Sequence, residues 1–390
     1  MVRLGVSVYP EQEKIKEIDA YLKLASKYGF SKVFTSLFSV EGTKEEIVNY
    51  FKSFSEIAHK YGMEVSGDSN GQFFKQMGAT ETDLSVFKEM GIDTIRMDFA
   101  FNDERDAILI NNKDGIHIEM STSFVDVIEK AIDNGTNIEN LSTCHNFYPQ
   151  RYTAPSIEKI NDLNNYWQSK NIKVGIFISS QVEGTHGPWP VSDGLPTIEN
   201  HRNLPIDLQL RHCLVMNNID EILIGNAFAS EEEFKAIDSV LKEVFINVPV
   251  NDSFGILKNF IPNGEIKRVP FNINLEEGIS DLEKEILFDF KTHNDLGDCL
   301  NYMLRSRFTR VIYKGKSIPE RKCDKTHYTR GDVVIVNNNL AHYLGEVQIV
   351  LKDIEVDGQR NLLGRIPEEE IMLLDSMKGT EVFGFIKKTK

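Results

Sequence analysis

Two patterns of apolar and polar positions divide the chain. Up to about residue 245, short runs rich in β-branched and aromatic residues alternate with longer amphipathic stretches such as 11–28 and 44–61. This alternation is typical of parallel strands joined by crossover helices. The predicted strands are 4–9, 32–38, 63–67, 94–99, 117–121, 141–147, 173–179 and 221–226.

Eight such strands are the number that closes a TIM (β/α)8 barrel, which is the fold that we predict for this part. Glycines at 29, 62, 91 and 135 follow amphipathic stretches, as expected where a helix ends in a left-handed residue. Only residues 103–112 are available for the helix between the fourth and fifth strands, so that crossover should be short or irregular. A doubly wound open sheet is the alternative.

Beyond about residue 245 the pattern changes to short β-rich runs separated by turn residues. Strands are predicted at 311–313, 332–336, 346–351 and 361–366, and the asparagines at 337–339 are typical of a turn. We therefore predict a barrel domain over residues 1–248 and a smaller β-rich domain over residues 249–390.

Charge and composition limit the possible partners. The 390 residues include 44 Lys and Arg against 59 Asp and Glu, a formal net charge of −15, which argues against a nucleic acid as partner. Apolar runs such as 174–178 are too short to span a membrane, and no signal peptide precedes the first predicted strand. We therefore expect a cytoplasmic protein that does not bind membranes, with reduced and mostly buried cysteines.

Two carboxylates interrupt apolar strands where a barrel would place its catalytic groups. Asp98 and Glu119 lie on neighbouring predicted strands, near their carboxyl ends, and such a pair can divide acid and base roles. The alternative is a structural ion pair of Asp98 with Arg96, which shares its side of the strand. Asp68 follows the third strand as a third candidate, unless it serves only an Asx turn or a helix cap.

Further polar and aromatic residues near the predicted strand ends suit a sugar. Tyr9 ends the first strand, whereas Asn146 and Tyr148 lie at the end of the sixth and lead toward Arg151. Hydroxyl groups accept and donate hydrogen bonds, an aromatic ring packs on a sugar face, and a guanidinium group binds an anion. The alternative is a polar loop whose Tyr148 packs on the barrel rim.

The segment 181–203 is too long for a plain strand-to-helix connection, and such length at a barrel rim is usually functional. Glu183, His201 and Arg202 are its candidate binding residues. Arg202 could instead pair with Glu199, three residues earlier.

Other kinds of site lack their sequence signals. The histidines form no H-E-x-x-H set, the phosphate-binding glycine motifs are missing, and there is no G-x-S-x-G segment. We therefore predict no dedicated metal site and no cofactor. A metal held by the oxygen atoms of Asp68, Asp98 and Glu119 stays open, because oxygen ligands leave little spacing signal.

Several segments together resemble a known family. They are GVSVYP at 5–10, RMDF at 96–99, CHNFYP at 144–149, GLPTIENHR at 194–202, RGDVVIVNN at 330–338 and YLGE at 343–346. In order and spacing the chain resembles the bacterial 6-phospho-N-acetylmuramidases, many of which were catalogued as putative outer surface proteins. The resemblance implies a TIM barrel with a C-terminal cyclophilin-like β-barrel. It also implies a cytoplasmic glycosidase that splits a phosphorylated muramyl disaccharide, 6-phospho-N-acetylmuramic acid linked to N-acetylglucosamine, in cell-wall sugar recycling.

The implied chemistry fits paired carboxylates. One protonated carboxyl donates to the leaving oxygen, while a second acts on the anomeric carbon or on water, unless the N-acetyl group of the substrate takes the nucleophilic role. The assignment to Asp98 and Glu119 still comes from the residues alone.

The implied substrate is anionic, and Arg151, His201, Arg202 and Arg330 are the candidates for its charged groups. Arg330 would bring the second domain over the barrel mouth, unless it is only a turn residue before a strand.

Two other functions stay open at this stage. One is a metal-dependent phosphosugar isomerase or aldolase, and the other is a noncatalytic phosphosugar-binding protein. A homodimer is also left open.

Overall fold

The structure is a computed structural model that describes residues 2–10, 14–191, 193–297 and 301–387. The chain divides into two compact units, Met1–Asp238 and Ser239–Lys390, and the division falls within helix α9 (Glu231–Val244). The sequence placed the domain boundary near residue 250. Each unit is described by itself.

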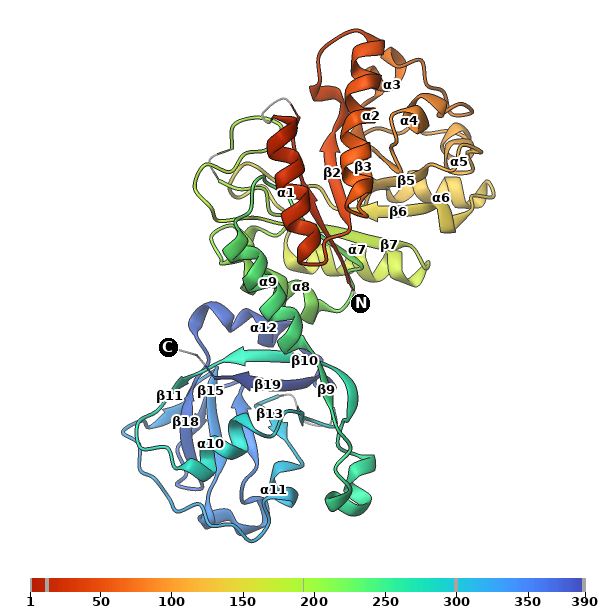
Figure 1. Cartoon of the computed structure of the whole chain (residues 1–390). Coiled ribbons are helices and arrows are strands. Elements are labelled where there is room, and N and C mark those ends of the chain that lie inside the picture. Colours follow the sequence, from red (N-terminus) through yellow and green to blue (C-terminus); the bar gives the residue numbers. More distant parts are fainter. Residues whose placement is uncertain (1, 11–13, 192, 298–300, 388–390) are drawn as a thin grey trace. The chain divides into compact units, whose positions relative to one another are not determined.

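The first unit is a closed barrel of eight parallel strands in sequence order (Figure 1). The strands are β1 Arg3–Ser7, β2 Lys32–Ser36, β3 Glu64–Ser69, β4 Thr94–Met97, β5 His117–Ser121, β6 Leu141–Cys144, β7 Lys173–Ile178 and β8 Glu221–Ile224. The ring closes where Arg3 of β1 pairs with Glu221 of β8. This closure confirms the predicted TIM-type barrel and excludes the open sheet.

Helices connect the strands. They are α1 Ile15–Lys27, α2 Lys44–Lys60, α3 Gly71–Gln76, α4 Ser85–Glu89, α5 Arg105–Ile110, α6 Val125–Asp133, α7 Ile157–Ser169 and α8 Ile206–Met216, with single turns η1 Leu37–Ser39, η2 Ile138–Asn140 and η3 Glu199–His201. α5 is short, as the sequence predicted. Gly29 and Gly62 have φ of 82° and 71° just after α1 and α2, which confirms their predicted role at helix ends.

Local sequence explains where α2 begins. Thr43 accepts a hydrogen bond from the backbone N–H of Glu46, and the Glu46 carboxylate accepts one from the backbone N–H of Thr43. This reciprocal capping satisfies two backbone donors that the first helical turn leaves without partners. The helix then buries one apolar face, including Ile47, Phe51 and Phe54.

The barrel interior holds an apolar cluster above a charged layer. Tyr9, Phe34, Cys144, Phe177, Leu223 and Ala227 are buried together. Lys32 and Glu221, two residues before Phe34 and Leu223 on the same strands, are buried as ions. Because side chains two apart point to the same side of a strand, the charged layer lies toward the amino-terminal ends of the strands.

The second unit is rich in β-structure. One sheet has the order β12-β19-β10-β9 and another has the order β11-β18-β15-β16-β13, with β14 and β17 forming a separate pair. The strands are β9 Phe245–Val248, β10 Gly264–Asn272, β11 Asn274–Leu275, β12 His293–Asn294, β13 Met303–Ser306, β14 His327–Tyr328, β15 Asp332–Val336, β16 Val347–Val350, β17 Ile354–Glu355, β18 Arg360–Arg365 and β19 Val382–Ile386. The cyclophilin-like likeness stays a prediction.

Helical segments complete this unit. They are α10 Asp281–Phe288, α11 Thr309–Ile312 and α12 Met372–Asp375, with η4 Asp252–Asn259, η5 Asn338–Tyr343 and η6 Glu368–Glu370. The strand predicted at 311–313 was wrong, because this segment lies at the end of α11. The other predicted strands correspond to β15, β16 and β18.

Two further predictions concern the whole chain. Among the described residues, no helix has the length and apolar character needed to cross a membrane. Cys144 and Cys213 are buried free thiols and Cys323 is a half-buried one, whereas Cys299 lies outside the described residues.

Candidate active site at the barrel rim

A cavity of about 290 Å³ lies at the carboxyl ends of the barrel strands. Its polar part comes from the ends of β2, β3 and β4 and from the segment after β6, whereas aromatic side chains form much of the remaining wall. The lining residues are Phe34, Ser36, Phe38, Asp68, Arg96, Asp98, Asn146, Phe147, Pro188 and Trp189. Aromatic rings beside carboxylates suit a ring-shaped polar ligand such as a sugar.

Strand register places Asp68 beside Arg96. The two residues are partners across β3 and β4, and the Arg96 Nη1 donates to the Asp68 Oδ1 at 3.0 Å. The other end of the guanidinium group, Nη2, donates to the Asn146 Oδ1. Arg96 is only 5% exposed. Its two hydrogen bonds therefore hold the Asp68 carboxylate and the Asn146 amide in fixed orientations at the cavity.

The two carboxylates of the cavity lie in different environments. Burial raises the pKa of Asp68 to about 6, an effect that Arg96 opposes and that Asp98 and Glu119 reinforce. Asp98 lies just beyond β4 and is exposed, and its carboxylate makes no hydrogen bond or ion pair with a described residue. Dissimilar environments of this kind allow one carboxyl to hold a proton while the other is ionised.

Glu119 lies elsewhere in the barrel. It is 2% exposed, its Oε2 is 2.9 Å from the Lys32 Nζ, and its Oε1 is 3.8 Å from the Arg96 Nε. It does not line the cavity. The structure thus brings Asp98 together with Asp68, and it places Glu119 behind Arg96 as a structural partner.

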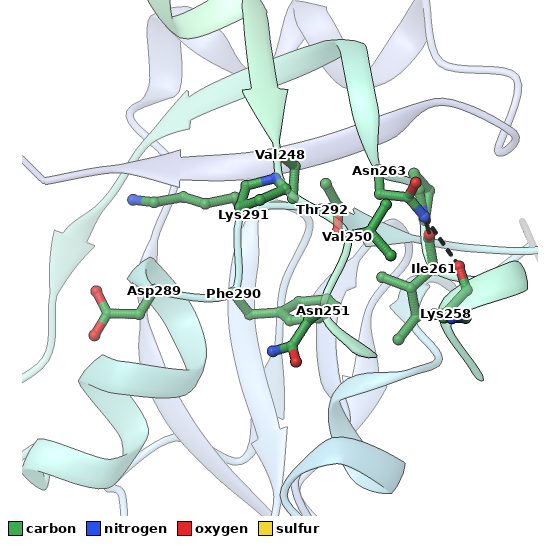
Figure 2. Close-up of a pocket in the computed structure, with 12 residues that line it drawn as sticks. Val248, Val250, Asn251, Lys258, Ile261, Asn263, Asp289, Phe290, Lys291 and Thr292 are labelled. Carbon is green, nitrogen blue, oxygen red and sulfur yellow. Dashed lines mark hydrogen bonds between the residues drawn. The ribbon is translucent and has the colours of Figure 1, made fainter. Parts of the chain in front are cut away.

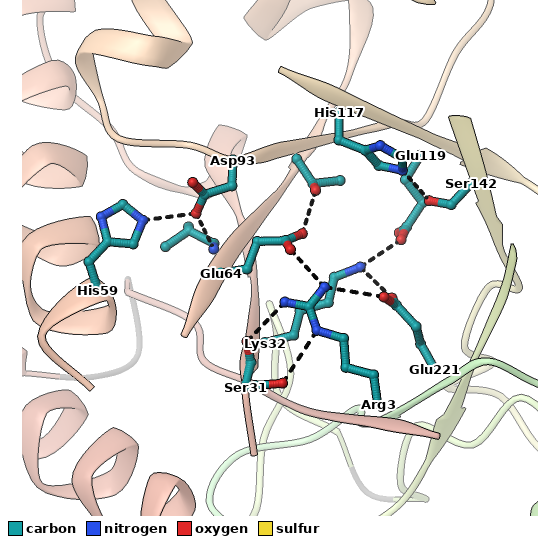
Figure 3. Close-up of polar contacts among 12 residues, drawn as sticks. Arg3, Ser31, Lys32, His59, Glu64, Asp93, His117, Glu119, Ser142 and Glu221 are labelled. Carbon is teal, nitrogen blue, oxygen red and sulfur yellow. Dashed lines mark hydrogen bonds and ion pairs between the residues drawn. The ribbon is translucent and has the colours of Figure 1, made fainter. Parts of the chain in front are cut away.

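Ion pairs continue from Glu119 through the barrel interior (Figure 3). Lys32 also binds Glu221 at 2.6 Å, and Arg3 lies 3.3 Å from Glu221 and 2.7 Å from Glu64. In spite of burial, the pKa of Glu64 is held below its usual range by the hydrogen bond from Thr94 and by the charges of Lys32 and Arg3, and the pKa of Glu221 is held low by Lys32 and Arg3. The two carboxylates beside Lys32 raise its pKa in turn, against the effect of burial. Every charge in this layer therefore has a partner, as buried ions require.

The segment after β6 contributes Asn146 and Phe147 to the cavity. The preceding His145 is buried, with its ring nitrogens at Thr122 and Asn164, and burial lowers its pKa to about 4. Tyr148 is half-buried, does not line the cavity and has its pKa raised by burial.

Arg202 holds the rim segments together. Its guanidinium group donates five hydrogen bonds, to both carboxylate oxygens of Glu199 and to the backbone carbonyls of Tyr148, Gln150 and Asp193. These bonds use all the donors of the side chain, which is 3% exposed, so Arg202 has little capacity left for an anionic ligand.

The remaining predicted cations are also engaged. His201 is fully buried against His212 at 2.7 Å, and burial holds its pKa well below the usual range. Arg151 pairs with Asp193 at 2.8 Å. In the second unit, Arg330 pairs with Asp375 at 2.5 Å.

Two predicted binding residues remain. Tyr9 is fully buried in the apolar cluster, where its hydroxyl donates to the Gly225 carbonyl, so it supports the barrel wall rather than a ligand. Glu183 is exposed and does not line the cavity.

Sequence reasoning missed part of the site. The sequence suggests Arg96 only as a partner of Asp98, and it does not show that Phe34, Phe38, Phe147 and Trp189 lie around one cavity. The Ser36 hydroxyl is buried without a hydrogen-bond partner in the described part of the chain, which suits a ligand hydroxyl. The available signal was the period of two that puts Phe34 and Ser36 on the inner side of β2.

Another cavity, of about 400 Å³, lies in the second unit (Figure 2). It is lined by residues 248–251, 258, 261–263 and 289–292, with apolar contacts from Val248, Ile261 and Phe290. None of the predicted site residues lines it. In the described ranges, no group of three or more His, Cys, Asp and Glu side chains is placed to hold a metal ion.

Comparisons with known proteins identify the family. Residues 4–239 match the model of the 6-phospho-N-acetylmuramidase N-terminal region, and residues 269–386 match the model of its C-terminal region. The chain belongs to the 6-phospho-N-acetylmuramidase family. It is therefore a glycosidase that acts on a phosphorylated muramic sugar. This assignment favours hydrolysis over the isomerase, aldolase and noncatalytic alternatives.

Two crystal structures are similar over nearly the whole chain. An uncharacterized B. cereus protein is 32% identical, with a TM-score of 0.82 and coverage of 99% of both chains. A conserved Enterococcus faecalis protein of unknown function is 21% identical, with a TM-score of 0.66 and coverage of 99% of this chain and 96% of the other, which shows a shared fold. A comparison with curated protein sequences gave no match.

Proposed function

We propose that this glycosidase hydrolyses the bond between 6-phospho-N-acetylmuramic acid and N-acetylglucosamine, with Asp68 as the general acid and Asp98 as the second carboxylate. The observation that carries the proposal is that both carboxylates line one cavity with aromatic walls, one half-buried beside Arg96 and the other exposed and unpaired. The proposed role is in cytoplasmic recycling of cell-wall sugars, as the family resemblance implies.

Asp68 suits the acid role because a carboxyl with a pKa of about 6 holds its proton far better than an ordinary aspartate. Arg96 fixes the orientation of the Asp68 carboxylate, leaving one oxygen for the glycosidic oxygen. When the proton leaves, Arg96 stabilises the carboxylate that forms, so that the same residue can later accept a proton from water.

Asp98 suits the second role because its exposed carboxylate is free to contact the substrate. It would orient the N-acetyl group of the muramic sugar for attack on the anomeric carbon, or it would act on that carbon or on water directly. Phe147 and Trp189, with ring centroids 6.5 Å apart, supply a wall against which a sugar face can pack.

The test is incubation of the full chain with the 6-phosphorylated and unphosphorylated muramyl disaccharides, followed by NMR of the anomeric proton released. We expect cleavage of the phosphorylated disaccharide. Asp68→Asn and Asp98→Asn should each lower kcat by about 10²-fold to 10⁴-fold, the usual contribution of acid–base groups. The control is Asp103→Asn, an exposed aspartate that pairs with Arg105 and does not line the cavity.

Near-normal turnover in both variants would contradict the assignment of these two residues. Tight binding of the intact disaccharide without cleavage would contradict the hydrolytic function itself.

A further inference from the structure

A cavity of about 580 Å³ in the second unit carries nitrogen donors and no carboxylates. Its lining residues come from α11 and the turn after it and from η5 and the residues that follow, namely Arg310, Val311, Lys314, Gly315, Ala341, His342 and Leu344. In a chain whose acidic residues outnumber its basic ones by 59 to 44, a cavity with three nitrogen-bearing side chains and no acid indicates a local preference for an anion.

The charge of Arg310 is only partly compensated. The buried carboxylate of Glu346 is bound through both oxygens by Arg305, at 2.6 and 3.0 Å, and one of these oxygens also accepts from Gln348. The Arg310 Nε is 3.6 Å from that carboxylate, beyond hydrogen-bond distance. Arg310 makes no hydrogen bond to any residue within the described ranges, and its nitrogen Nε is buried.

Packing holds the Arg310 guanidinium group in place. Its Cζ is 4.6 Å from the centroid of the Tyr343 ring, a cation–π distance. Gly345 has a φ of 84° and lies against Arg310, because a Cβ built there would be 3.8 Å from the Arg310 Cα. The turn at Gly345 thus keeps η5 against α11.

Lys314 and His342 add two more donors. Both are exposed, and neither side chain has a hydrogen bond or ion pair with a described residue. The Glu346 carboxylate is already bound by Arg305, so the positive charge of Arg310 is only partly offset, and Lys314 supplies a second positive charge. This local excess of positive charge contrasts with Arg151 and Arg330, each of which faces its own carboxylate.

We propose that Arg310, Lys314 and His342 form a binding site for the phosphate monoester of a small molecule. A phosphate monoester carries close to two negative charges at pH 7 and three acceptor oxygens, which match two cations and an imidazole. A ligand with only one carboxylate would leave one of the two cations, Arg310 or Lys314, without a counter-charge. Val311, Ala341 and Leu344 provide apolar surface for the carbon skeleton of the ligand.

This proposal stands on residues of the second unit and does not rest on the catalytic roles of Asp68 and Asp98. The phosphate could belong to the phosphorylated muramic sugar of the family or to another phosphorylated metabolite. Both kinds of ligand carry a phosphate monoester, so the experiment includes a probe for each.

Isothermal titration of the full chain tests the site with four probes: inorganic phosphate, N-acetylmuramic acid 6-phosphate, unphosphorylated N-acetylmuramic acid and glycerol 3-phosphate. We expect saturable binding of the phosphorylated probes, weakened by about tenfold to hundredfold in Arg310→Gln and in Lys314→Gln, as for the loss of a charge-assisted contact. Lys316→Gln is the matched control, because Lys316 is an exposed lysine close by that does not line the cavity.

Preference for the phosphorylated muramic sugar over glycerol 3-phosphate would support the proposal and identify the substrate or product as the source. Equal affinities would support a general phosphate monoester site. Absence of saturable phosphate binding, or equal affinities in Lys314→Gln and Lys316→Gln, would overturn it.

Lys314 is exposed, so its substitution leaves the fold intact even where Arg310→Gln disturbs the contact with Tyr343. Asp98→Asn should keep phosphate binding while it loses turnover, which separates this proposal from the catalytic one.

Discussion

At the scale of single residues, Asp68 is the group in which burial and charge most directly set chemistry. Burial raises its pKa to about 6, Arg96 opposes the rise, and the negative charges of Asp98 and Glu119 add to it. As a general acid it acts in the protonated form. We therefore expect kcat/KM to fall tenfold per pH unit above an apparent pKa near 6, because the protonated fraction of the free enzyme falls at that rate.

Glu119→Gln should move the descending limb of the kcat/KM profile, which is the fall above pH 6, to lower pH. Loss of the Glu119 charge removes a group that raises the pKa of Asp68 and frees more of the Arg96 charge, which lowers it. The profile of kcat/KM against pH for wild type and variant is the measurement. At acidic pH, where Asp68 is protonated in both proteins, turnover should return close to that of the wild type, because Glu119 lies beside Arg96 and does not line the cavity.

Glu64→Gln is the matched control for that experiment. It removes another carboxylate of the interior ion pairs, one bound by Arg3 and Thr94, and it should leave the limb in place. A uniform loss of turnover at every pH in Glu119→Gln, with no movement of the limb, would contradict the positioning role.

At the scale of elements, β2 shows how a barrel strand can bury a cation. Lys32 is 2% exposed and lies between Glu119 and Glu221, at 2.9 and 2.6 Å. Lys32→Met should lower the free energy of unfolding by about 3–5 kcal/mol, because it leaves two buried carboxylates without their shared partner. Urea unfolding followed by circular dichroism measures this change.

The control for β2 is Lys27→Met at the end of α1, where an exposed lysine pairs with Glu231. That substitution should change the stability very little, since exposed ion pairs contribute weakly. Equal effects of the two substitutions would contradict the structural role of the buried ion pairs.

The elements also show what the sequence can and cannot predict. Alternating apolar runs predicted all eight barrel strands, and the rule that barrels carry their sites at the carboxyl ends of strands selected Asp68, Asp98 and Glu119 as candidates. Asp68 and Asp98 line the cavity and Glu119 does not, because a sequence shows which side of a strand a residue faces but not how deep in the barrel it lies. The run at 311–313 looked like a strand and formed the end of a helix, since tertiary packing outweighs propensity in short segments.

Loop contributions were the least predictable. Pro188 and Trp189 reach the cavity from the long segment after β7, whose path depends on tertiary contacts such as the five hydrogen bonds of Arg202. No local pattern encodes the bonds from Arg202 to the backbone carbonyls of Tyr148 and Gln150, because these two residues lie 54 and 52 positions away in the sequence. The pairing of Arg202 with Glu199, by contrast, was visible from their spacing.

At the scale of the whole molecule, an excess of acidic residues determines which cations remain free. Arg151, Arg202 and Arg330 each face a carboxylate, so their presence in the sequence did not make them anion sites. Arg96, the cation that lines the barrel cavity, is bound to Asp68. A cation without a full partner is therefore more informative in this chain than in a basic one, and Arg310 and Lys314 are informative for that reason.

Buried histidines determine how the stability of the whole molecule depends on pH. Burial lowers the pKa values of His145 and His212 to about 4 and of His293 to about 3, and it holds that of His201 well below its usual range. The unfolded chain protonates its histidines near pH 6.5, so between about pH 4 and 6.5 it binds more protons than the folded chain. Stability should therefore fall as the pH is lowered through this window.

Asp68 acts in the opposite direction, because its raised pKa lets the folded state bind a proton that the unfolded state releases above about pH 4. The four histidines less Asp68 give a difference of up to about three protons near pH 5, or about 4 kcal/mol per pH unit. Burial also lowers the pKa of His117 and raises that of Asp106, and these two shifts act on the difference in opposite directions. Urea unfolding from pH 5 to 7 measures this slope.

His212→Gln should reduce the slope by about one proton, roughly 1.4 kcal/mol per pH unit. The control is His59→Gln, at an exposed position beside Asp93, which should leave the slope unchanged. Equal slopes in the two variants would show that the buried His201–His212 pair does not set the acid sensitivity of the fold.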